Sequence, residues 1–395
     1  MKPCIVWDSI LSLEKSSKGD ISQIVNMTTA LAEQKVNVSL VALNAGRMHI
    51  DGAKIKQVPN LWYIRQRTRT LGRIFPRVYG YESRGNAHHV AKFVVSVLDP
   101  YEQYDLYHVR SPYIAMELKR LQPSKPLVYT SIPRYLHSKS HKDKILDQKV
   151  LDVADKIIAL TEGWKRYNIE EYDLKGREIT VVPVCVPNIS DIPEIENLPE
   201  YIKGRKIIGY FGRLQEKYGI DTLIETIPEV KRTIGNVGVI IAGGSFYNYD
   251  QELKKLAYKL DVYGDIFFTG EIPRALVPSY MKKCNVLISL RYDEVSDRFH
   301  YGFDLSIPIK CVEYITCGKP VVATRDGGME QLLGKDYPYL VDHNNKSQIV
   351  HSLIKLLTDD EEAARIGIEN KRISMSYTYE SVVNKLIGVY RKACE

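Results

Sequence analysis

Residues 306–323 read SIPIKCVEYITCGKPVVA, and this stretch indicates the fold class. Its first part, Pro308–Cys317, has apolar side chains at helical spacing, and Gly318 is a typical helix stop. Its last part, Pro320–Thr324, is a short apolar run that favours a buried strand. A helix followed closely by a buried strand is the unit from which parallel α/β sheets are built, so we expect this fold class.

The same alternation of strands and helices extends on both sides of this stretch, over residues 206–375. The predicted strands are Lys206–Phe211, Val237–Ala242, Ile266–Thr269, Val286–Leu290, Pro320–Thr324 and Tyr339–Val341. The predicted helices are Asp221–Thr233, Asp250–Leu260, Ala275–Cys284, Pro308–Cys317, Met329–Leu333, Ser347–Leu357 and Glu361–Arg372. A last helix, Tyr379–Lys392, closes the chain.

The first half of the chain shows a second series of the same kind. Its predicted strands are Ile5–Trp7, Val36–Leu43, Leu106–Val109, Pro126–Thr130, Lys156–Leu160 and Ile179–Val182. Its predicted helices are Asp20–Gln34, Ala87–Leu98, Ile114–Leu121 and Leu146–Val153. Two series of this kind predict two doubly wound parallel sheets.

A proline-rich stretch separates the two series. Pro187, Pro193 and Pro199 lie among polar residues, which indicates an interdomain linker or, alternatively, a surface loop. We therefore expect an α/β protein of two Rossmann-like domains, 1–190 and 206–375, with a linker at 191–205 and a closing helix in 376–395 that crosses back to the first domain. Parallel sheets that face a central cleft bind ligands beyond the carboxyl ends of their strands.

Composition indicates a folded globular protein, since 44% of the 395 residues are hydrophobic and 26% are charged. No apolar run approaches the ~18 residues of a membrane helix, and the N-terminus lacks a secretory apolar core. We therefore expect a cytoplasmic protein. The six cysteines show no metal-ligand or redox spacing, so a zinc site is not expected.

Positive charge is concentrated in the first half of the chain. Residues 1–190 hold 28 Lys and Arg against 19 Asp and Glu, whereas the remainder holds 27 against 29. Residues 61–92 are especially basic and aromatic, with Glu82 as their one acid. Such a stretch suits an anionic membrane surface, a nucleic acid or a solvated loop, and nucleic acid is the least favoured of the three.

The helix opening at Ser306, Ile307 and Pro308 is the first candidate site. Ser306 is the expected N-cap, with Pro308 in the first turn. Free backbone N–H groups and the helix dipole suit a diphosphate there, and Lys310 adds a positive charge. Glu313, on the same face, suits the hydroxyl groups of a ribose. A capped helix with a solvated Lys310–Glu313 pair is the plain alternative.

The loop after Lys206–Phe211 is the second candidate site. Gly212 opens a turn that carries Arg213 and Lys217, two side chains that bind phosphate well. Because the loop leaves the carboxyl end of its strand, we expect it at the same edge as the Pro308 helix opening. A basic loop without a ligand remains the alternative. Gly19, before the first helix, is a weaker candidate for close approach to a ligand.

These motifs resemble glycosyltransferase family 4, a group of retaining enzymes with the GT-B fold. The resemblance covers most of the chain and is strongest over residues 205–345, including Gly212-Arg213-Leu214 and the segment from Glu313 to Ala323. It implies that Arg213 and a nearby lysine bind the diphosphate of a nucleotide-sugar donor. It further implies that Glu313 holds the ribose and that Gly19 faces the donor.

Several positions depart from the pattern of that family. The glutamate expected eight residues before Glu313 is Leu305, and the neighbouring Asp304 is the candidate substitute. The family's lysine falls on Tyr218, one place after Lys217. These departures leave two other functions open: a non-catalytic nucleotide-sugar-binding subunit, and a GT-B nucleotide-sugar epimerase.

The resemblance implies an enzyme that moves a sugar from a UDP or GDP sugar, with retention, to a glycan, glycolipid or other acceptor. Arg213, Lys217 and Asp304 are the expected catalytic residues. No metal or other cofactor is required where cations and a helix dipole neutralise the leaving diphosphate. The expected partners are the donor, a saccharide or lipid-linked acceptor and, through residues 61–92, an anionic surface at the inner face of the membrane.

Overall fold

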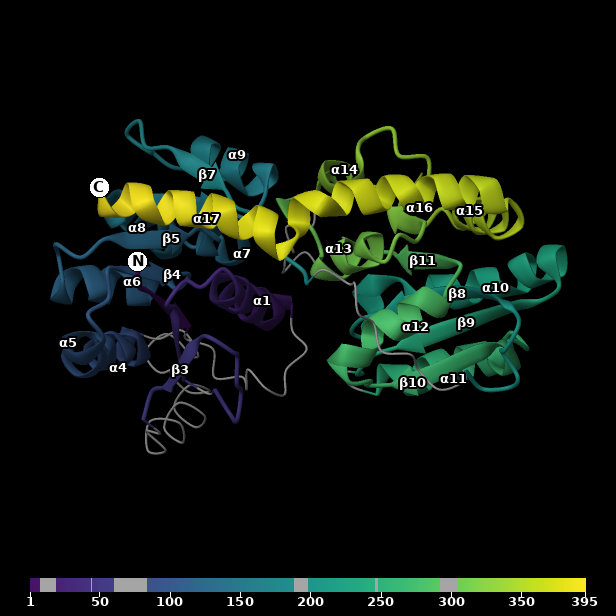
Figure 1. Cartoon of the computed structure of the whole chain (residues 1–395). Helices are drawn as coiled ribbons and strands as arrows, with labels where there is room; N and C mark the ends of the chain where they lie inside the picture. Colours follow the sequence, from purple (N-terminus) through teal and green to yellow (C-terminus); the bar gives the residue numbers. More distant parts are fainter. Residues whose placement is uncertain (8–18, 44, 60–83, 188–197, 246–247, 292–304) are drawn as a thin grey trace. The chain divides into compact units, whose positions relative to one another are not determined.

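The structure, a computed structural model of the whole chain, describes residues 1–7, 19–43, 45–59, 84–187, 198–245, 248–291 and 305–395. These residues form two compact units (Figure 1). The first unit combines Met1–Pro187 with Tyr379–Glu395, and the second is Asn188–Thr378. Each unit has one sheet in which every strand pair is parallel, so the predicted α/β class is confirmed.

The sheet of the first unit has seven strands in the order β3-β2-β1-β4-β5-β6-β7. Its strands are β1 (Pro3–Trp7), β2 (Ser39–Ala42), β3 (Lys54–Gln57), β4 (Leu106–Val109), β5 (Leu127–Thr130), β6 (Lys156–Ala159) and β7 (Ile179–Val181). Strands β1, β2, β4 and β5 are buried along their whole length, as expected for a sheet covered on both faces.

Helices surround this sheet. They are α1 (Gly19–Glu33), α4 (Arg84–Phe93), α5 (Asp99–Glu102), α6 (Pro112–Leu121), α7 (Arg134–Ser138), α8 (His141–Val153), α9 (Glu162–Glu171) and α17 (Tyr379–Cys394), with a π-helical segment at Val94–Leu98. The N-terminal turns of α6 and α9 are capped by Ser111 and Thr161, whose side chains accept hydrogen bonds from Ile114 N and Trp164 N.

The C-terminal helix α17 is part of the first unit's core (Figure 1). Val383, Leu386 and Tyr390 are fully buried in one apolar cluster with residues of β1 and α1. The hydroxyl group of Tyr390 also lies 2.7 Å from Nδ1 of His108 on β4. The helix is therefore held by an apolar face and by one buried polar contact.

The sheet of the second unit has six strands in the order β10-β9-β8-β11-β12-β13. They are β8 (Lys206–Phe211), β9 (Val237–Ala242), β10 (Ile266–Gly270), β11 (Val286–Ser289), β12 (Val321–Thr324) and β13 (Leu340–Val341). The sequence predicts β8 and β9 with the same bounds, because each is a nearly continuous apolar run, as central parallel strands require.

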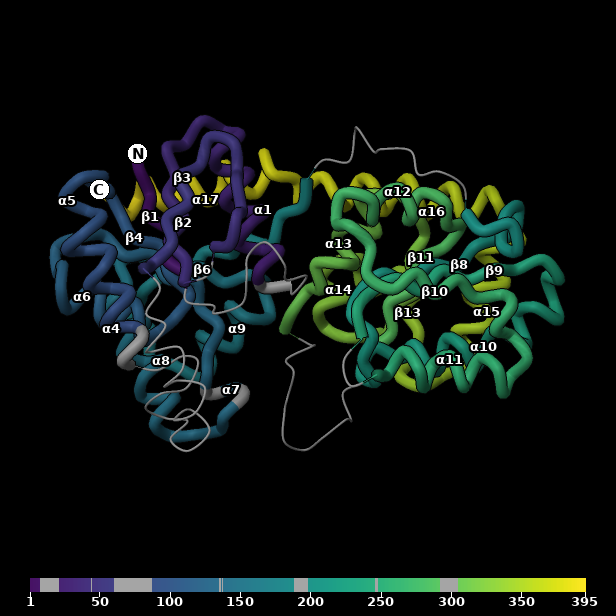
Figure 2. The backbone as a smooth tube through the Cα atoms, turned by 90° about the horizontal axis from the view of Figure 1, so that it is seen from below, coloured from purple at the N-terminus to yellow at the C-terminus, as the bar shows by residue number. Residues whose placement is uncertain are grey.

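Helices cover both faces of this second sheet, with α12 on one side of the strands and α10 and α11 on the other (Figure 2). The α-helices are α10 (Ile220–Ile234), α11 (Tyr249–Lys259), α12 (Val277–Lys283), α13 (Ile309–Thr316), α14 (Gly327–Leu333), α15 (Lys346–Thr358) and α16 (Asp360–Ser374). Short 3₁₀ turns are η2 (Glu216–Tyr218), η3 (Tyr263–Asp265), η4 (Arg274–Leu276) and η6 (Met375–Tyr377).

The strand orders place a topological switch point in each unit. Successive connections run in opposite directions from β1 and β4 in the first sheet, and from β8 and β11 in the second. In open parallel sheets, ligands bind beyond the carboxyl ends of the strands at such a switch point. The residues at 212–217 follow β8, and the chain continues from β11 to α13, so the predicted site lies at the switch point of the second sheet.

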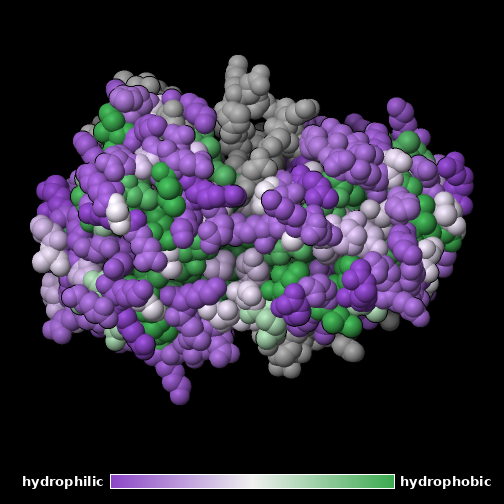
Figure 3. All heavy atoms as spheres, turned by 90° about the horizontal axis from the view of Figure 1, so that it is seen from above, coloured by the Kyte–Doolittle hydropathy of each residue, from purple (hydrophilic) through white to green (hydrophobic). Residues whose placement is uncertain are grey.

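The outer surface is largely polar in the view of Figure 3, with smaller groups of apolar residues between the polar ones. Among the residues that the structure describes, no helix combines the length and the apolar character needed to cross a membrane. Residues 60–83 lie outside the described part, so the predicted basic-aromatic stretch at 61–92 is largely untested. The predicted linker at 191–205 also lies partly outside it.

Candidate functional site

The loop after β8 passes very close to the end of β9. Gly212 N donates to Ala242 O at 2.9 Å, and Leu214 N donates to Gly244 O at 2.9 Å. A Cβ atom on Gly243 would lie 1.8 Å from Gly212 O, and Gly243 has a φ of +146°. Glycine is therefore required at 243 for the two backbones to meet and to form the floor of the site.

Helix α13 is fixed directly against the end of β8. The Tyr314 hydroxyl accepts a hydrogen bond from Phe211 N at 2.7 Å and donates one to Phe211 O at 2.8 Å. The two rings also meet edge to face, with centroids 6.4 Å apart. The predicted shared edge between the β8 loop and α13 is thus present in the structure.

The start of α13 has no side-chain cap. The sequence predicts Ser306 as N-cap, but the N-cap is Pro308 and the helix begins at Ile309, so that prediction is wrong. The physical reason is that Ser306 precedes the first turn by too many residues to reach its N–H groups. No hydrogen bond from Ile309 N or Lys310 N to a described residue is present. The predicted stop is confirmed, since Gly318 follows the C-cap with a φ of +66°.

Lys310 projects from this uncapped start into an aromatic cage. Its Nζ atom lies 4.6 Å from the ring centroid of Tyr210 and 4.5 Å from that of Tyr218. Among the described residues, this buried nitrogen has no hydrogen-bond partner. Burial lowers the pKa of Lys310 to about 8, and the nearby Arg291 adds to the effect. Two rings offset part of the cost of burying an ammonium group, but an anion would offset far more.

Arg213 and Lys217 supply further positive charge beside the cage. Lys217 Nζ lies 5.4 Å from the ring centroid of Tyr218, the same ring that Lys310 contacts. Burial lowers the pKa of Lys217 to about 8, and repulsion from Arg213 contributes. A Cβ atom on Gly212 would lie 3.4 Å from Lys310 Cδ, so the loop and α13 are in contact. The structure therefore brings Gly212, Lys217 and Lys310 together at one sheet edge.

Glu313 lies one turn further along α13. Its side chain is 27% exposed, and Arg274 Nη2 lies 4.0 Å from its Oε1 atom. Burial raises the pKa of Glu313, and Arg274 counteracts this. No hydrogen bond between the Glu313 carboxylate and a described residue is present. The carboxylate is thus available to accept hydrogen bonds from the hydroxyl groups of a ligand.

A buried ion pair, which no sequence motif predicts, supports the same edge of the sheet. Arg291, which follows β11, donates from Nη2 to both carboxylate oxygens of Asp326, and the side chains are only 3% and 9% exposed. Arg291 Nη1 also donates to Ser306 O at 3.4 Å. Asp326 in turn caps α14 by accepting from Met329 N at 2.8 Å. Arg291 therefore ties the peptide before α13 to the next helix start.

The remaining predicted residues are placed as follows. Ile307 is buried and precedes α13. Gly19 begins α1 in the first unit, and its predicted role toward the donor stays a prediction. Asp304 lies outside the described residues, and Leu305 is partly buried. Within the described ranges, no group of three or more His, Cys, Asp or Glu side chains is arranged to hold a metal ion.

Comparison with known families identifies the second unit. Residues 191–373 match the model of the family described as glycosyl transferases group 1. This segment contains the β8 loop, the aromatic cage and α13. This segment of the chain is therefore similar to the group 1 glycosyl transferases.

Individual relatives agree with this assignment. The D-inositol 3-phosphate glycosyltransferase of Corynebacterium jeikeium is 25% identical over 262 residues, which are 63% of this chain and 60% of that protein. A GDP-mannose-dependent alpha-(1-6)-phosphatidylinositol monomannoside mannosyltransferase of Mycolicibacterium smegmatis is 28% identical over 42% of each chain. The chain thus spans less than two thirds of these relatives' length.

Solved structures show the fold more completely. Anabaena HepE in complex with UDP and glucose superposes with a TM-score of 0.68 at 16% identity, covering 98% of both chains. Sucrose-phosphate synthase of Thermosynechococcus elongatus gives a TM-score of 0.71 at 15% identity, covering 99% of this chain and 98% of that one. With its two parallel sheets, the chain therefore has the GT-B fold, as predicted.

Proposed function

We propose that the chain transfers a sugar from a nucleoside diphosphate sugar, with retention of anomeric configuration, to a glycan, glycolipid or other acceptor. The observation that carries the proposal is the Lys310 ammonium group. It is held between two tyrosine rings at an uncapped helix start, without a hydrogen-bond partner among the described residues. A diphosphate supplies the negative charge and the acceptor oxygens that this arrangement lacks.

The physical task of such an enzyme is to stabilise the leaving diphosphate while the bond to the sugar breaks. Lys310, Lys217 and Arg213 provide fixed positive charge for it, and the N–H groups at the start of α13 provide hydrogen bonds. The amide-rich backbone at Gly212 allows close approach, and Glu313 holds the ribose. With this much positive charge, the transfer requires no metal or other cofactor.

Other parts of the proposal rest on the sequence resemblance. Gly19 faces the donor, and Asp304 takes the place of the missing motif glutamate. The donor is a UDP or GDP sugar, and the acceptor is a saccharide or a lipid-linked group. The excess of positive charge in residues 1–190 favours a cytoplasmic enzyme that works at the inner face of the membrane, on anionic lipid. A nucleic acid is not a partner in this proposal.

Substitutions in the second unit test the assignment of the donor site. Arg213→Ala and Glu313→Ala are each expected to lower the rate of donor hydrolysis or transfer by about 100-fold, because each removes a charged contact to the donor. The assay contains EDTA and a panel of UDP and GDP sugars. If both variants retain full activity, the site assignment is wrong.

The same panel separates the proposal from its two alternatives. A non-catalytic binding subunit binds a nucleotide sugar without turnover under any condition. An epimerase forms product without an acceptor. Both alternatives are tested because Leu305 occupies the position at which the family motif has a glutamate.

Affinity for the donor diphosphate is expected to fall as the pH rises through about 8, since Lys217 and Lys310 each have a pKa lowered to about 8 by burial. Lysine binds phosphate as ammonium, so the interaction is complete below this pKa and is lost above it. The last proton of a terminal phosphate leaves near about pH 6, so the charge of UDP stays constant over the range tested.

Titration calorimetry with UDP or GDP is the measurement. Binding at about pH 9.5 is expected to be at least about tenfold weaker than at about pH 7.5, whereas Arg213 keeps its charge throughout. An affinity that does not change over this range would show that neither lysine contacts the diphosphate.

A further inference from the structure

The chain passes between the two units at two places, and helix α1 of the first unit contacts the chain at both. The first unit's long segment ends at Pro187, and its second segment starts at Tyr379, the first residue of α17. Cys185, just before the first passage, and Val383, just after the second, belong to the same buried apolar cluster as Ile24 of α1. Two connections that are far apart in the sequence therefore meet on one helix.

A single side chain of α1, that of Asn26, is bonded to both connections. Its Nδ2 atom donates a hydrogen bond to Cys185 O at 2.7 Å. Its Oδ1 atom accepts a hydrogen bond from the Tyr379 hydroxyl at 3.2 Å. The donor and the acceptor of one amide group are thus used on different connections.

An asparagine is an expensive residue for this position. Asn26 is only 3% exposed, and it lies on a helix whose other buried side chains include Ile21, Ile24 and Leu31. A leucine of similar size would pack there without any hydrogen bond, whereas a buried amide must be bonded to offset its desolvation. The amide therefore adds directional contacts that apolar packing does not supply.

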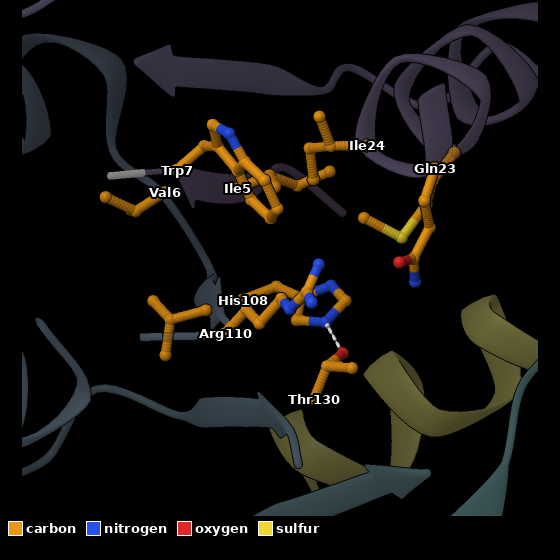
Figure 4. Close-up of a pocket in the computed structure, with 10 residues that line it drawn as sticks. Ile5, Val6, Trp7, Gln23, Ile24, His108, Arg110 and Thr130 are labelled. Carbon is orange, nitrogen blue, oxygen red and sulfur yellow. Dashed lines mark hydrogen bonds between the residues drawn. The ribbon is translucent and has the colours of Figure 1, made fainter. Parts of the chain in front are cut away.

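Helix α17 has a second polar contact further along. Tyr390 follows Tyr379 by about three helical turns, so the two tyrosines lie on the same face of the helix. The Tyr390 hydroxyl lies 2.7 Å from Nδ1 of His108, whose Nε2 atom lies 2.7 Å from Thr130 Oγ1 (Figure 4). Burial lowers the pKa of His108 to about 3, so this neutral contact does not change near physiological pH. The body of α17 is thus fixed to the sheet, and Asn26 acts on its first turn.

We infer that Asn26 is a positioning residue that clamps the two interdomain connections to α1, so that they move together and not separately. Connections that are held at one point let the two units turn about that point but not slide past each other. The clamp follows from contacts within the first unit, whereas its role in catalysis rests on the proposed transferase function. In that proposal Gly19, at the start of α1, faces the donor, so α1 must keep a reproducible position relative to the second unit.

Hydrogen exchange of the whole protein tests the clamp without turnover. Asn26→Leu keeps the approximate size of the side chain and removes both hydrogen bonds. The backbone amides of residues 182–187 and 379–386 are both expected to exchange about tenfold faster, whereas those of β8 in the second unit do not change. Tyr379→Phe, a milder change, is expected to give a smaller increase in the same two segments, because Asn26 loses one of its two partners.

Thr28→Val is the matched control. Thr28 is a fully buried polar residue of the same helix, but its hydroxyl donates to Ile24 O of α1 itself at 2.8 Å. Its replacement is expected to leave exchange in both segments within about twofold of the unmodified protein. The control thus separates loss of the clamp from a general loosening of α1.

Enzyme kinetics test the role of the clamp in the proposed reaction. Asn26→Leu is expected to lower kcat about tenfold and Tyr379→Phe about threefold, because the reacting groups are held less reproducibly. The affinity for UDP or GDP is expected to stay the same in both variants, because the proposed nucleotide site lies in the second unit. Thr28→Val is expected to keep both kcat and affinity.

Faster exchange in only one of the two segments of Asn26→Leu, or in neither, would overturn the clamp, and so would an equal increase in Thr28→Val. If Asn26→Leu does not fold, Tyr379→Phe decides, and unchanged exchange at 182–187 would overturn the clamp. Faster exchange in both segments with an unchanged kcat would overturn its role in catalysis. Absence of turnover by the unmodified protein would instead count against the proposed function, and the exchange result would still decide the clamp.

Discussion

Replacing Lys310 by methionine is expected to weaken binding of UDP or GDP about 10- to 100-fold and to lower the rate of transfer by about 100-fold. Methionine keeps the length and the apolar stem of the side chain but removes its charge. The lost interaction is a charge-assisted one, in a cage where two tyrosine rings exclude water from the ammonium group.

The same substitution has an unusual expected effect on the ligand-free protein. Because the Lys310 nitrogen is buried without a hydrogen-bond partner among the described residues, its removal relieves a desolvation cost. The melting temperature without ligand is therefore expected to stay the same or rise, while the rise caused by UDP disappears. Thermal denaturation with and without nucleotide measures both effects in one experiment.

Lys283→Met is the matched control, since Lys283 is an exposed lysine of the same unit on α12. It is expected to change neither the melting temperature nor the nucleotide affinity by a measurable amount. A folded Lys310→Met protein that binds UDP and GDP as tightly as the unmodified protein would contradict the role given to Lys310.

Replacing Arg291 by methionine is expected to lower the free energy of unfolding by about 3–5 kcal/mol. The Asp326 carboxylate would remain, 9% exposed, without the guanidinium group that donates to both of its oxygens, although Met329 N would still donate to Oδ1. Ser306 O would lose the hydrogen bond from Arg291 at the same time, so the peptide before α13 would be held less firmly. Urea denaturation monitored by circular dichroism is the measurement.

Arg325→Met provides the comparison for this second prediction. Arg325 pairs with Glu330 at 3.3 Å, but its side chain is 40% exposed, so its removal is expected to cost about 1 kcal/mol or less. A similarly small cost for Arg291→Met would show that the Arg291–Asp326 pair does not hold the two helix starts together.

Much of the fold was predictable because its strands are short apolar runs between turn residues. β8 and β9 have the predicted bounds for this reason, and α17 was expected from its helical apolar spacing. β3, with the sequence Lys-Ile-Lys-Gln, was not predicted. It lies at the sheet edge and has no buried residue, so it carries neither an apolar run nor an apolar alternation.

Helix α9 was missed for a related reason. Its sequence, EGWKRYNIEE, is mostly polar, and only a few of its side chains are buried. What defines it is the Thr161 cap, which accepts from Trp164 N at 3.0 Å, together with the packing of Trp164. A capping threonine is too common in loops to predict a helix without an apolar stripe.

The candidate site was predictable in its residue types but not in its geometry. Lys310 and Glu313 were predicted because a helix start at a sheet edge suits a diphosphate. That Tyr218 forms one wall of a cage for Lys310 depends on contact between η2 and α13, which sequence spacing does not encode. Arg291 and Asp326 are 35 residues apart, so their pairing became evident only from the folded chain.

The most direct test of the central claim is a crystal structure of the protein with UDP or GDP, whichever binds more tightly. The account predicts diphosphate oxygens within about 3 Å of Lys310 Nζ and of an N–H group in the first turn of α13. A nucleotide bound with its diphosphate away from both groups would contradict it.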